Sequence, residues 1–212
     1  MSELDRIASR QGRQDEAPNI ELARELAESG DTGAIREIVA HLWDRDANVR
    51  SDCIKVLYEL GELKPELIAP YADDFLRLLT DRQNRMVWGG MTALAATVAI
   101  AADAIAPHAD EIVTAMGRGS VIAVDNGVRA LARLAATSPA RNAALFPLLL
   151  DHLERCRAKE MPQHAESTLV AVTPDNRAAF IVLLERRLPE LSLAQAARIR
   201  RILRRLASPT DG

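Results

Sequence analysis

An internal repeat of 37 residues constrains the fold of this 212-residue chain more than any other feature. The segments CIKVLYELG, GMTALAATV and GVRALARLA begin 37 residues apart, at Cys53, Gly90 and Gly127. A small residue opens each segment, and apolar residues follow at the i, i+3, i+4, i+7 spacing of an amphipathic helix. The fifth position is always leucine. A repeat of this length indicates stacked supersecondary units that share one core.

A second apolar segment with a proline follows in each copy. Ile68-Ala-Pro70 lies 37 residues before Ile105-Ala-Pro107, and the third copy places Pro147 a further 40 residues on. Proline is best tolerated in the first turn of a helix, so we expect these prolines near helix starts. Weaker helix pairs flank the three copies. Ser192-x-x-Gln195 is a capping box that predicts the start of a last helix.

The composition favours helices throughout, because Ala, Leu and Arg are common and the β-branched and aromatic runs of strands are scarce. We therefore predict an all-α protein, an α/α superhelix of about five helix pairs with a terminal capping helix. A polar N-terminal extension precedes a single solenoid domain. The expected boundaries are 1–18 for the extension, 19–212 for the domain, 19–43, 46–80, 83–117, 120–157 and 160–188 for the pairs, and 192–207 for the cap.

One unit resembles the HEAT repeat, in particular the PBS-lyase-like subtype. It reads DRDANVRSDCIKVLYELG from Asp44, with an Asp-containing turn, Val49-Arg50, a small residue at Cys53 and a Leu-x-x-Leu-Gly end. The central unit departs from this pattern, with Met86-Val87 in place of Val-Arg. The resemblance implies an α-solenoid that binds proteins or nucleic acid. Some relatives attach or remove bilin chromophores, and others excise alkylated bases.

Residues 86–102, MVWGGMTALAATVAIAA, carry no charge. Seventeen residues are short for a bilayer, which needs about 20, and the stretch is in register with the repeat, so we expect no membrane span. The outward side of the preceding unit is charged, whereas the same side of this helix is not. It is either a tightly packed helix or a docking face for a partner, a second copy or residues 1–18. The candidate interface residues are Trp88, Gly89, Thr92, Ala96 and Ala99.

Acidic residues recur on the second helices of the pairs. Alignment on the prolines places one carboxylate in each repeat at the same position, and Asp73 and Asp110 sit beside two of them. Residues 1–116 hold 12 basic and 21 acidic side chains, net −9. We predict an acidic groove that attracts a basic protein partner, although solvation alone also explains exposed charges. The candidate residues are Glu37, Asp74, Glu111 and Asp151, with Tyr71 and His108 in a second column.

Residues 177–212 are basic, with 8 basic and 3 acidic side chains. The stretch ARIRRILRRLA has an apolar stripe and an arginine face. A polar terminal helix is required to close a solenoid, and phosphate or an acidic protein surface is an alternative ligand. Association of the basic end with the acidic half of another copy would give a homo-oligomer. The basic patch comprises Arg186, Arg187, Arg198, Arg201, Arg204 and Arg205.

Motifs of catalysis are missing from the sequence, which has no P-loop, H-E-x-x-H or G-x-S-x-G. His152 and Cys156 are one helical turn apart with His164 nearby, a weak metal-site pattern that more often reflects structural residues. The cysteines, at 53 and 156, are isolated, which favours a reducing compartment, and we expect a cytoplasmic protein.

We therefore expect a non-enzymatic scaffold, without cofactor or metal, that binds a protein through the acidic groove or the charge-free face. The alternative is a nucleic-acid or alkylated-base binding module that uses the arginine-rich helix. A weaker alternative is a bilin lyase-like protein.

Overall fold

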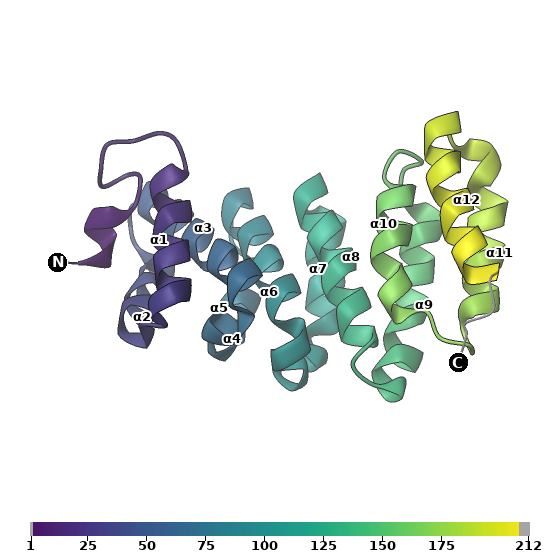
Figure 1. Cartoon of the computed structure of the whole chain (residues 1–212), viewed down its shortest axis with the longest axis horizontal. Coiled ribbons are helices and arrows are strands. Elements are labelled where there is room, and N and C mark those ends of the chain that lie inside the picture. Colours follow the sequence, from purple (N-terminus) through teal and green to yellow (C-terminus); the bar gives the residue numbers. More distant parts are fainter. Residues whose placement is uncertain (1, 208–212) are drawn as a thin grey trace. The chain divides into compact units, whose positions relative to one another are not determined.

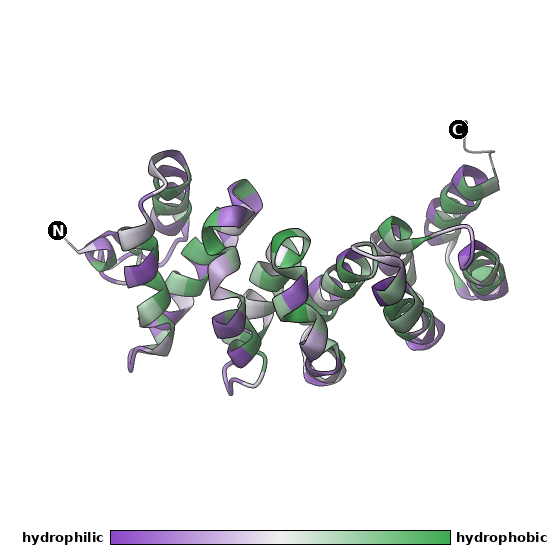
Figure 2. Cartoon of the chain, turned by 90° about the horizontal axis from the view of Figure 1, so that it is seen from below, coloured by the Kyte–Doolittle hydropathy of each residue, from purple (hydrophilic) through white to green (hydrophobic). Residues whose placement is uncertain are grey.

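The computed structural model describes residues 2–207, and these residues form helices, turns and loops without a strand. The chain divides into two compact units, residues 1–130 and residues 131–212, and the dividing point lies within one helix. Each unit consists of antiparallel helix pairs, as Figure 1 shows. Most helices carry both hydrophobic and hydrophilic residues (Figure 2), as expected of amphipathic helices that bury one side.

The first unit holds the first three helix pairs and the start of the next helix. Its first helices α1, α3 and α6 lie side by side, and α5 packs on α6 (Figure 1). The elements are η1 (Glu3–Arg6), α1 (Ala17–Ser29), α2 (Thr32–Ala40), η2 (His41–Trp43), α3 (Ala47–Leu63), α4 (Pro65–Ile68), η3 (Ala69–Tyr71), α5 (Ala72–Leu78), α6 (Asn84–Ile105), η4 (Ala106–His108), α7 (Ala109–Arg118) and α8 (Val121–Ala135), which continues into the second unit.

The second unit ends in the predicted capping helix. The capping box is confirmed, because the backbone N–H of Ser192 donates to Gln195 Oε1 at 2.8 Å and that of Gln195 donates to Ser192 Oγ at 3.4 Å. The elements after α8 are α9 (Pro139–Arg155), α10 (Met161–Thr168), η5 (Leu169–Ala171), α11 (Arg177–Arg187), η6 (Leu188–Glu190) and α12 (Leu193–Ala207).

The small residue that opens each repeat lies at a close helix contact. Cys53, Gly90 and Gly127 are all buried. A Cβ atom on Gly90 would lie 2.9 Å from Leu78 Cβ and 3.0 Å from the Phe75 carbonyl oxygen, both on α5. The equivalent contact occurs one repeat later, where a Cβ on Gly127 would meet the side chain of Met116 on α7. The small residue therefore lets the first helix of a pair rest on the second helix of the preceding pair.

The prolines do not all lie where the sequence placed them. Pro70 and Pro107 sit in the 3-10 turns η3 and η4, just ahead of α5 and α7. The expectation for Pro147 is wrong, because it lies inside α9. That helix starts earlier, at Pro139, where Ser138 Oγ accepts a hydrogen bond from the Arg141 backbone N–H at 3.2 Å. A serine cap followed by proline at the first helical position moves the helix start upstream.

The polar N-terminal segment is part of the first unit. Ile7 has no exposed surface, so it belongs to the core. The Ala8 backbone N–H donates to Asn19 Oδ1 at 2.9 Å, and that of Ser9 donates to Asp52 Oδ2 at 2.7 Å. These contacts hold the segment against α1 and α3.

The apolar helix α6 is explained by packing within the first unit. By length and composition the stretch Asn84–Arg118 could cross a membrane, but 56% of its most apolar window is buried inside the protein. Its backbone also kinks at Ala101, where φ is −101° and ψ is 25°. Contacts with α3 and α5 on two sides account for the missing charges.

Substitution of two glycines tests the close helix contact. Gly90→Ala should lower the free energy of unfolding by about 1–2 kcal/mol, because overpacking against α5 outweighs the gain in helix propensity. Gly117→Ala is the matched control, since the point that its methyl group would occupy on α7 faces open space apart from the helix's own backbone. It should raise the free energy of unfolding by about 0.5–1 kcal/mol. Urea unfolding of both variants measures the difference, and equal effects would contradict the packing account.

Candidate functional site

The four acidic residues aligned by sequence have different surroundings in the structure. Glu37 on α2 accepts hydrogen bonds from the Ser2 hydroxyl and, at 3.4 Å, from the Glu3 backbone N–H. The Glu37 carboxylate is therefore already hydrogen-bonded by the N-terminal segment of the same chain. Asp74 pairs with Arg77 one turn later at 3.5 Å. Asp151 is exposed on α9, in the second unit, and pairs with Arg155 at 2.6 Å.

Two neighbouring hollows follow the second helices of the first unit. One hollow, of about 410 Å³, lies between α5 and the segment formed by η4 and α7. The other, of about 420 Å³, lies between the α4–η3–α5 segment and the end of α6. Asp73 lines both, and we call the two together the acidic groove. Its lining residues are Asp73, Leu76, Arg77, Thr80, His108 and Glu111 in the first hollow and Glu66, Ala69, Pro70, Ala72, Asp73, Ile100, Ala101, Asp103 and Ala104 in the second.

The structure thus brings Glu111 and His108 into one hollow, together with Asp73 and not Asp74. The imidazole Nδ1 of His108 lies 2.7 Å from Glu111 Oε1. Tyr71 is half-buried on η3 and does not line either hollow. Sequence alignment missed Glu66 and Ile100, because nothing local indicates that the ends of α4 and α6 meet.

The charge of the acidic groove is only partly compensated. Among the described residues, the lining carboxylates Glu66 and Asp73 have no ion-pair partner. Arg77 is the arginine in the lining, and its guanidinium stacks 4.1 Å above the ring of Trp43. The groove also exposes apolar surface, since Ile100 is 53% exposed. Unpaired carboxylates beside apolar surface suit a long basic side chain with an aliphatic stem.

The charge-free face of α6 is in part a contact with α3. The expectation that Gly89 faces outward is wrong, because Gly89 is buried and a Cβ there would lie 2.6 Å from Ile54 Cγ1. Ala96 faces Gly61 of the same neighbouring helix. Since the first helices stack on one another, the side that appears outward in one pair is covered by the preceding pair.

The remaining members of that face are half-buried or exposed. The ring of Trp88 lies 5.6 Å from that of Tyr58, and the Arg85 guanidinium lies 4.3 Å above it. Thr92 is half-buried and donates its hydroxyl hydrogen bond to the Trp88 carbonyl at 2.8 Å. Ala99 is exposed. The face is therefore covered by α3 at Gly89 and partly open at Trp88, Thr92, Ala96 and Ala99.

A buried cation joins the N-terminal segment to α3 and α6. Lys55 is 7% exposed, and its ammonium lies 2.9 Å from Glu16 and 2.7 Å from Glu59. Glu16 also pairs with Arg85 at 2.5 Å. Burial acts to raise the pKa of Glu16, but hydrogen bonds from Lys55 and Arg85 outweigh it and lower that pKa.

The arginine-rich end is partly neutralised by the second unit itself. The prediction that Arg187 belongs to an exposed patch is wrong, because it is 5% exposed and donates to the carbonyls of Leu153, Glu154 and Cys156. Those carbonyls lie at the C-terminal end of α9, where a cation is favourable. The other arginines lie nearer the surface: Arg186 pairs with Glu154, Arg198 pairs with Glu166 at 2.7 Å, and Arg201, Arg204 and Arg205 are exposed.

Comparisons with known proteins place the fold among armadillo- and HEAT-like helical repeats. No protein-family profile matches the chain, and no curated protein matches it by sequence. A designed armadillo repeat protein in complex with the peptide (KR)4 is similar, with a TM-score of 0.68, 15% identity and coverage of 88% of this chain and 86% of that chain. A second designed armadillo repeat protein, YIII(Dq)4CqI, has a TM-score of 0.65 and 17% identity, with coverage of 97% of this chain and 91% of that chain.

The karyopherin Kap121p, bound to the SUMO protease Ulp1p, is also similar, with a TM-score of 0.64 and 13% identity over 93% of this chain. The match spans 22% of the karyopherin chain. These likenesses confirm the predicted fold class, an all-α superhelix of stacked helix pairs.

The Glu16 contacts predict a pH-dependent contribution to stability. Glu16→Gln should lower the free energy of unfolding at neutral pH by about 0.5–1 kcal/mol, a value for a half-exposed pair that solvent screens. Because the folded pKa lies below the unfolded value of about 4.3, the contribution is present above that pH and is lost as pH falls through the folded pKa. Urea unfolding of both proteins across this range measures it, with Glu21→Gln on the exposed side of α1 as control. A difference that persists in acid would contradict the ion-pair account.

Proposed function

We propose that this chain is a protein-binding helical-repeat scaffold whose acidic groove receives a lysine- or arginine-rich segment of its partner. The observation that carries the proposal is the pair of adjoining hollows that share Asp73 and have carboxylates along their walls. Their negative charge agrees with the acidic balance of the first unit. Such a surface increases the rate of encounter with a basic ligand and disfavours acidic ones.

The chemistry of the lining suits an extended basic peptide more than a small ion. Glu66, Asp73 and Glu111 offer acceptors at successive points along the groove. Pro70 and Ile100 offer apolar surface on which the aliphatic stems of Lys or Arg can lie. Arg77, the arginine in the lining, is stacked on Trp43 and pairs with Asp74.

The structural neighbours support the same class of function. The designed armadillo protein is bound to an alternating Lys-Arg peptide, and the karyopherin is bound to a protein. Stacked helix pairs of this kind therefore present surfaces that bind peptides and proteins. By contrast, three of the arginines expected to form a phosphate-binding patch, Arg186, Arg187 and Arg198, have acidic partners within the second unit. We therefore favour a protein ligand over nucleic acid.

Charge reversal in the groove tests the proposal. The double variant Asp73→Lys/Glu111→Lys should weaken binding of a fluorescent Lys-Arg repeat peptide by about 100-fold, because like charges at the contact cost several kcal/mol. Fluorescence anisotropy measures the affinity, and binding to the unmodified protein should weaken as salt rises.

The matched control is Glu21→Lys/Glu28→Lys, which makes the same change in net charge on exposed positions of α1. This control should retain binding to within a few-fold. Equal losses in the two double variants would show attraction to net charge alone and would contradict a groove. Tighter binding of a DNA oligonucleotide than of the peptide, lost on Arg201→Glu/Arg205→Glu, would favour the nucleic-acid alternative.

A further inference from the structure

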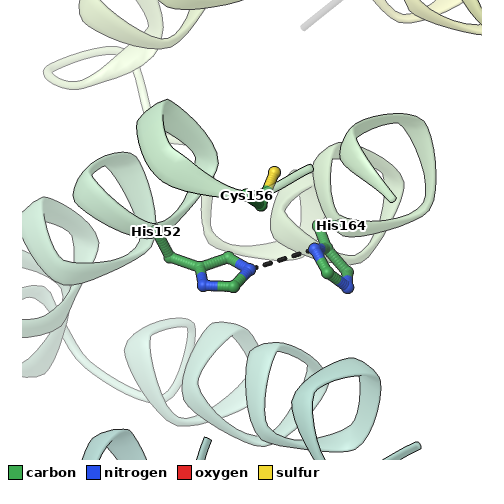
Figure 3. A group of neighbouring side chains, drawn as sticks. All are labelled: His152, Cys156 and His164. Carbon is green, nitrogen blue, oxygen red and sulfur yellow. Dashed lines mark hydrogen bonds between the residues drawn. The ribbon is translucent and has the colours of Figure 1, made fainter. Parts of the chain in front are cut away.

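A cluster of two histidines and one cysteine lies in the second unit, on elements that do not contribute to the acidic groove. His152 and Cys156 are one turn apart at the end of α9, and His164 lies in the first turn of α10. The two imidazoles point toward each other, and the sulfur lies beside them (Figure 3). His152 Nε2 and His164 Nδ1 are 3.0 Å apart. One ligand atom from each of the three residues lies within 4.8 Å of the others.

The cluster is partly enclosed by protein. His164 has no exposed surface, and His152 and Cys156 are half-buried. Among residues 2–207 this is the one group of three His, Cys, Asp or Glu side chains that is close enough to hold an ion. This partial burial limits the access of bulk water to an ion held there, in contrast to an exposed acidic surface.

The distances fit a tetrahedral ion after a small adjustment. Zinc binds imidazole nitrogen at about 2.0–2.1 Å and thiolate sulfur at about 2.3 Å, so tetrahedral angles place two nitrogens about 3.3 Å apart and a nitrogen and sulfur about 3.6 Å apart. The two nitrogens at 3.0 Å are already near that separation. The Cys156 sulfur has to move by about 1 Å toward the two nitrogens to reach that separation. Cys156 follows the last residue of α9, where its backbone is extended, and its side chain is half-buried.

The Arg187 guanidinium lies beside Cys156. Burial raises the pKa of this thiol, and the nearby Arg187 guanidinium opposes that shift. Arg187 Nη1 donates to the Cys156 carbonyl at 2.9 Å and lies 3.8 Å from its sulfur. The same contact fixes the end of α9, so the sulfur is held by a well-anchored backbone. Binding of a metal ion to the sulfur releases the thiol proton to solvent.

We propose that His152 Nε2, Cys156 Sγ and His164 Nδ1 bind one Zn²⁺ ion, which ties the end of α9 to the start of α10. One thiolate and two imidazoles match the preference of zinc for nitrogen and sulfur and do not suit Mg²⁺ or Ca²⁺, which take oxygen ligands. Three protein ligands leave one position for water.

Metal titration of the full chain, without an affinity tag, tests the site. Zinc should bind with one equivalent per chain in competition with a chromophoric chelator and should raise the unfolding temperature. Cobalt, used as a spectroscopic probe, should give the visible bands of a tetrahedral site and a near-ultraviolet thiolate-to-cobalt band. Cys156→Ser should remove the thiolate band. It should also weaken zinc binding by more than about 100-fold, because loss of a residue that only supports a ligand already costs about 10–100-fold.

Two controls separate this site from other histidines and thiols. Cys53→Ala removes the other cysteine, which is buried at a helix contact, and His108→Gln removes an exposed imidazole in the first unit. Both should bind zinc and give the thiolate band like the unmodified protein. His152→Ala serves as a second site variant because His152 is half-buried, and far-ultraviolet circular dichroism verifies that it folds.

The proposal is overturned if zinc does not bind, or if Cys156→Ser and His152→Ala keep full affinity. Loss of the thiolate band in Cys53→Ala would also overturn it. A further contrary outcome is a folded but less stable His152→Ala variant, with zinc leaving the unfolding temperature of both this variant and the unmodified protein unchanged. The imidazole pair would then serve only as a hydrogen bond between helices.

Discussion

The close approach of successive helix pairs is the constraint on which the structure of the first unit depends. Gly90 has no room for a Cβ atom because α5 lies directly against it. A helix held at that distance fixes the position of the next pair, and with it the spacing of side chains along the second helices. The acidic groove follows from this spacing, since its carboxylates come from the ends of several helices. The positions of the groove carboxylates therefore depend on a close helix contact that only a small core residue such as Gly90 allows.

Helix pairs were predictable from sequence because their signals are local and repeated. The recurring small residue, the leucine four positions later and the Ser192–Gln195 capping box each act within one or two turns, and each predicted the correct element. The outward side of α6 was not predictable in the same way. Each residue along a helix is rotated by about 100° from the one before it. Whether Gly89 faces solvent or α3 therefore depends on how the two helices pack, and the residues next to Gly89 in the sequence do not indicate this.

Site residues depend on longer-range geometry, and prediction was less successful there. Alignment on prolines did find equivalent helix starts, since α5 begins two residues after Pro70 and α7 begins two residues after Pro107. A hollow between two neighbouring helices is lined by the sides that face each other, and these sides carry non-equivalent positions. Asp73 and not Asp74 therefore meets Glu111 in one hollow. Arg187 reads as one more charge in an arginine-rich tail. Its carbonyl partners at the end of α9 lie more than 30 residues earlier, and no pattern within the tail indicates them.

The two candidate sites differ in how they would hold a cation. Carboxylates in the acidic groove are hydrated and screened by salt, so they favour a ligand with several charges spread along its length over a single ion. The histidine–cysteine cluster has few ligands but encloses them, and its donor atoms are soft enough to displace the hydration shell of zinc. A polycationic peptide cannot enter the cluster, and a lone Zn²⁺ gains little from separated carboxylates. Each site should therefore discriminate against the ligand of the other.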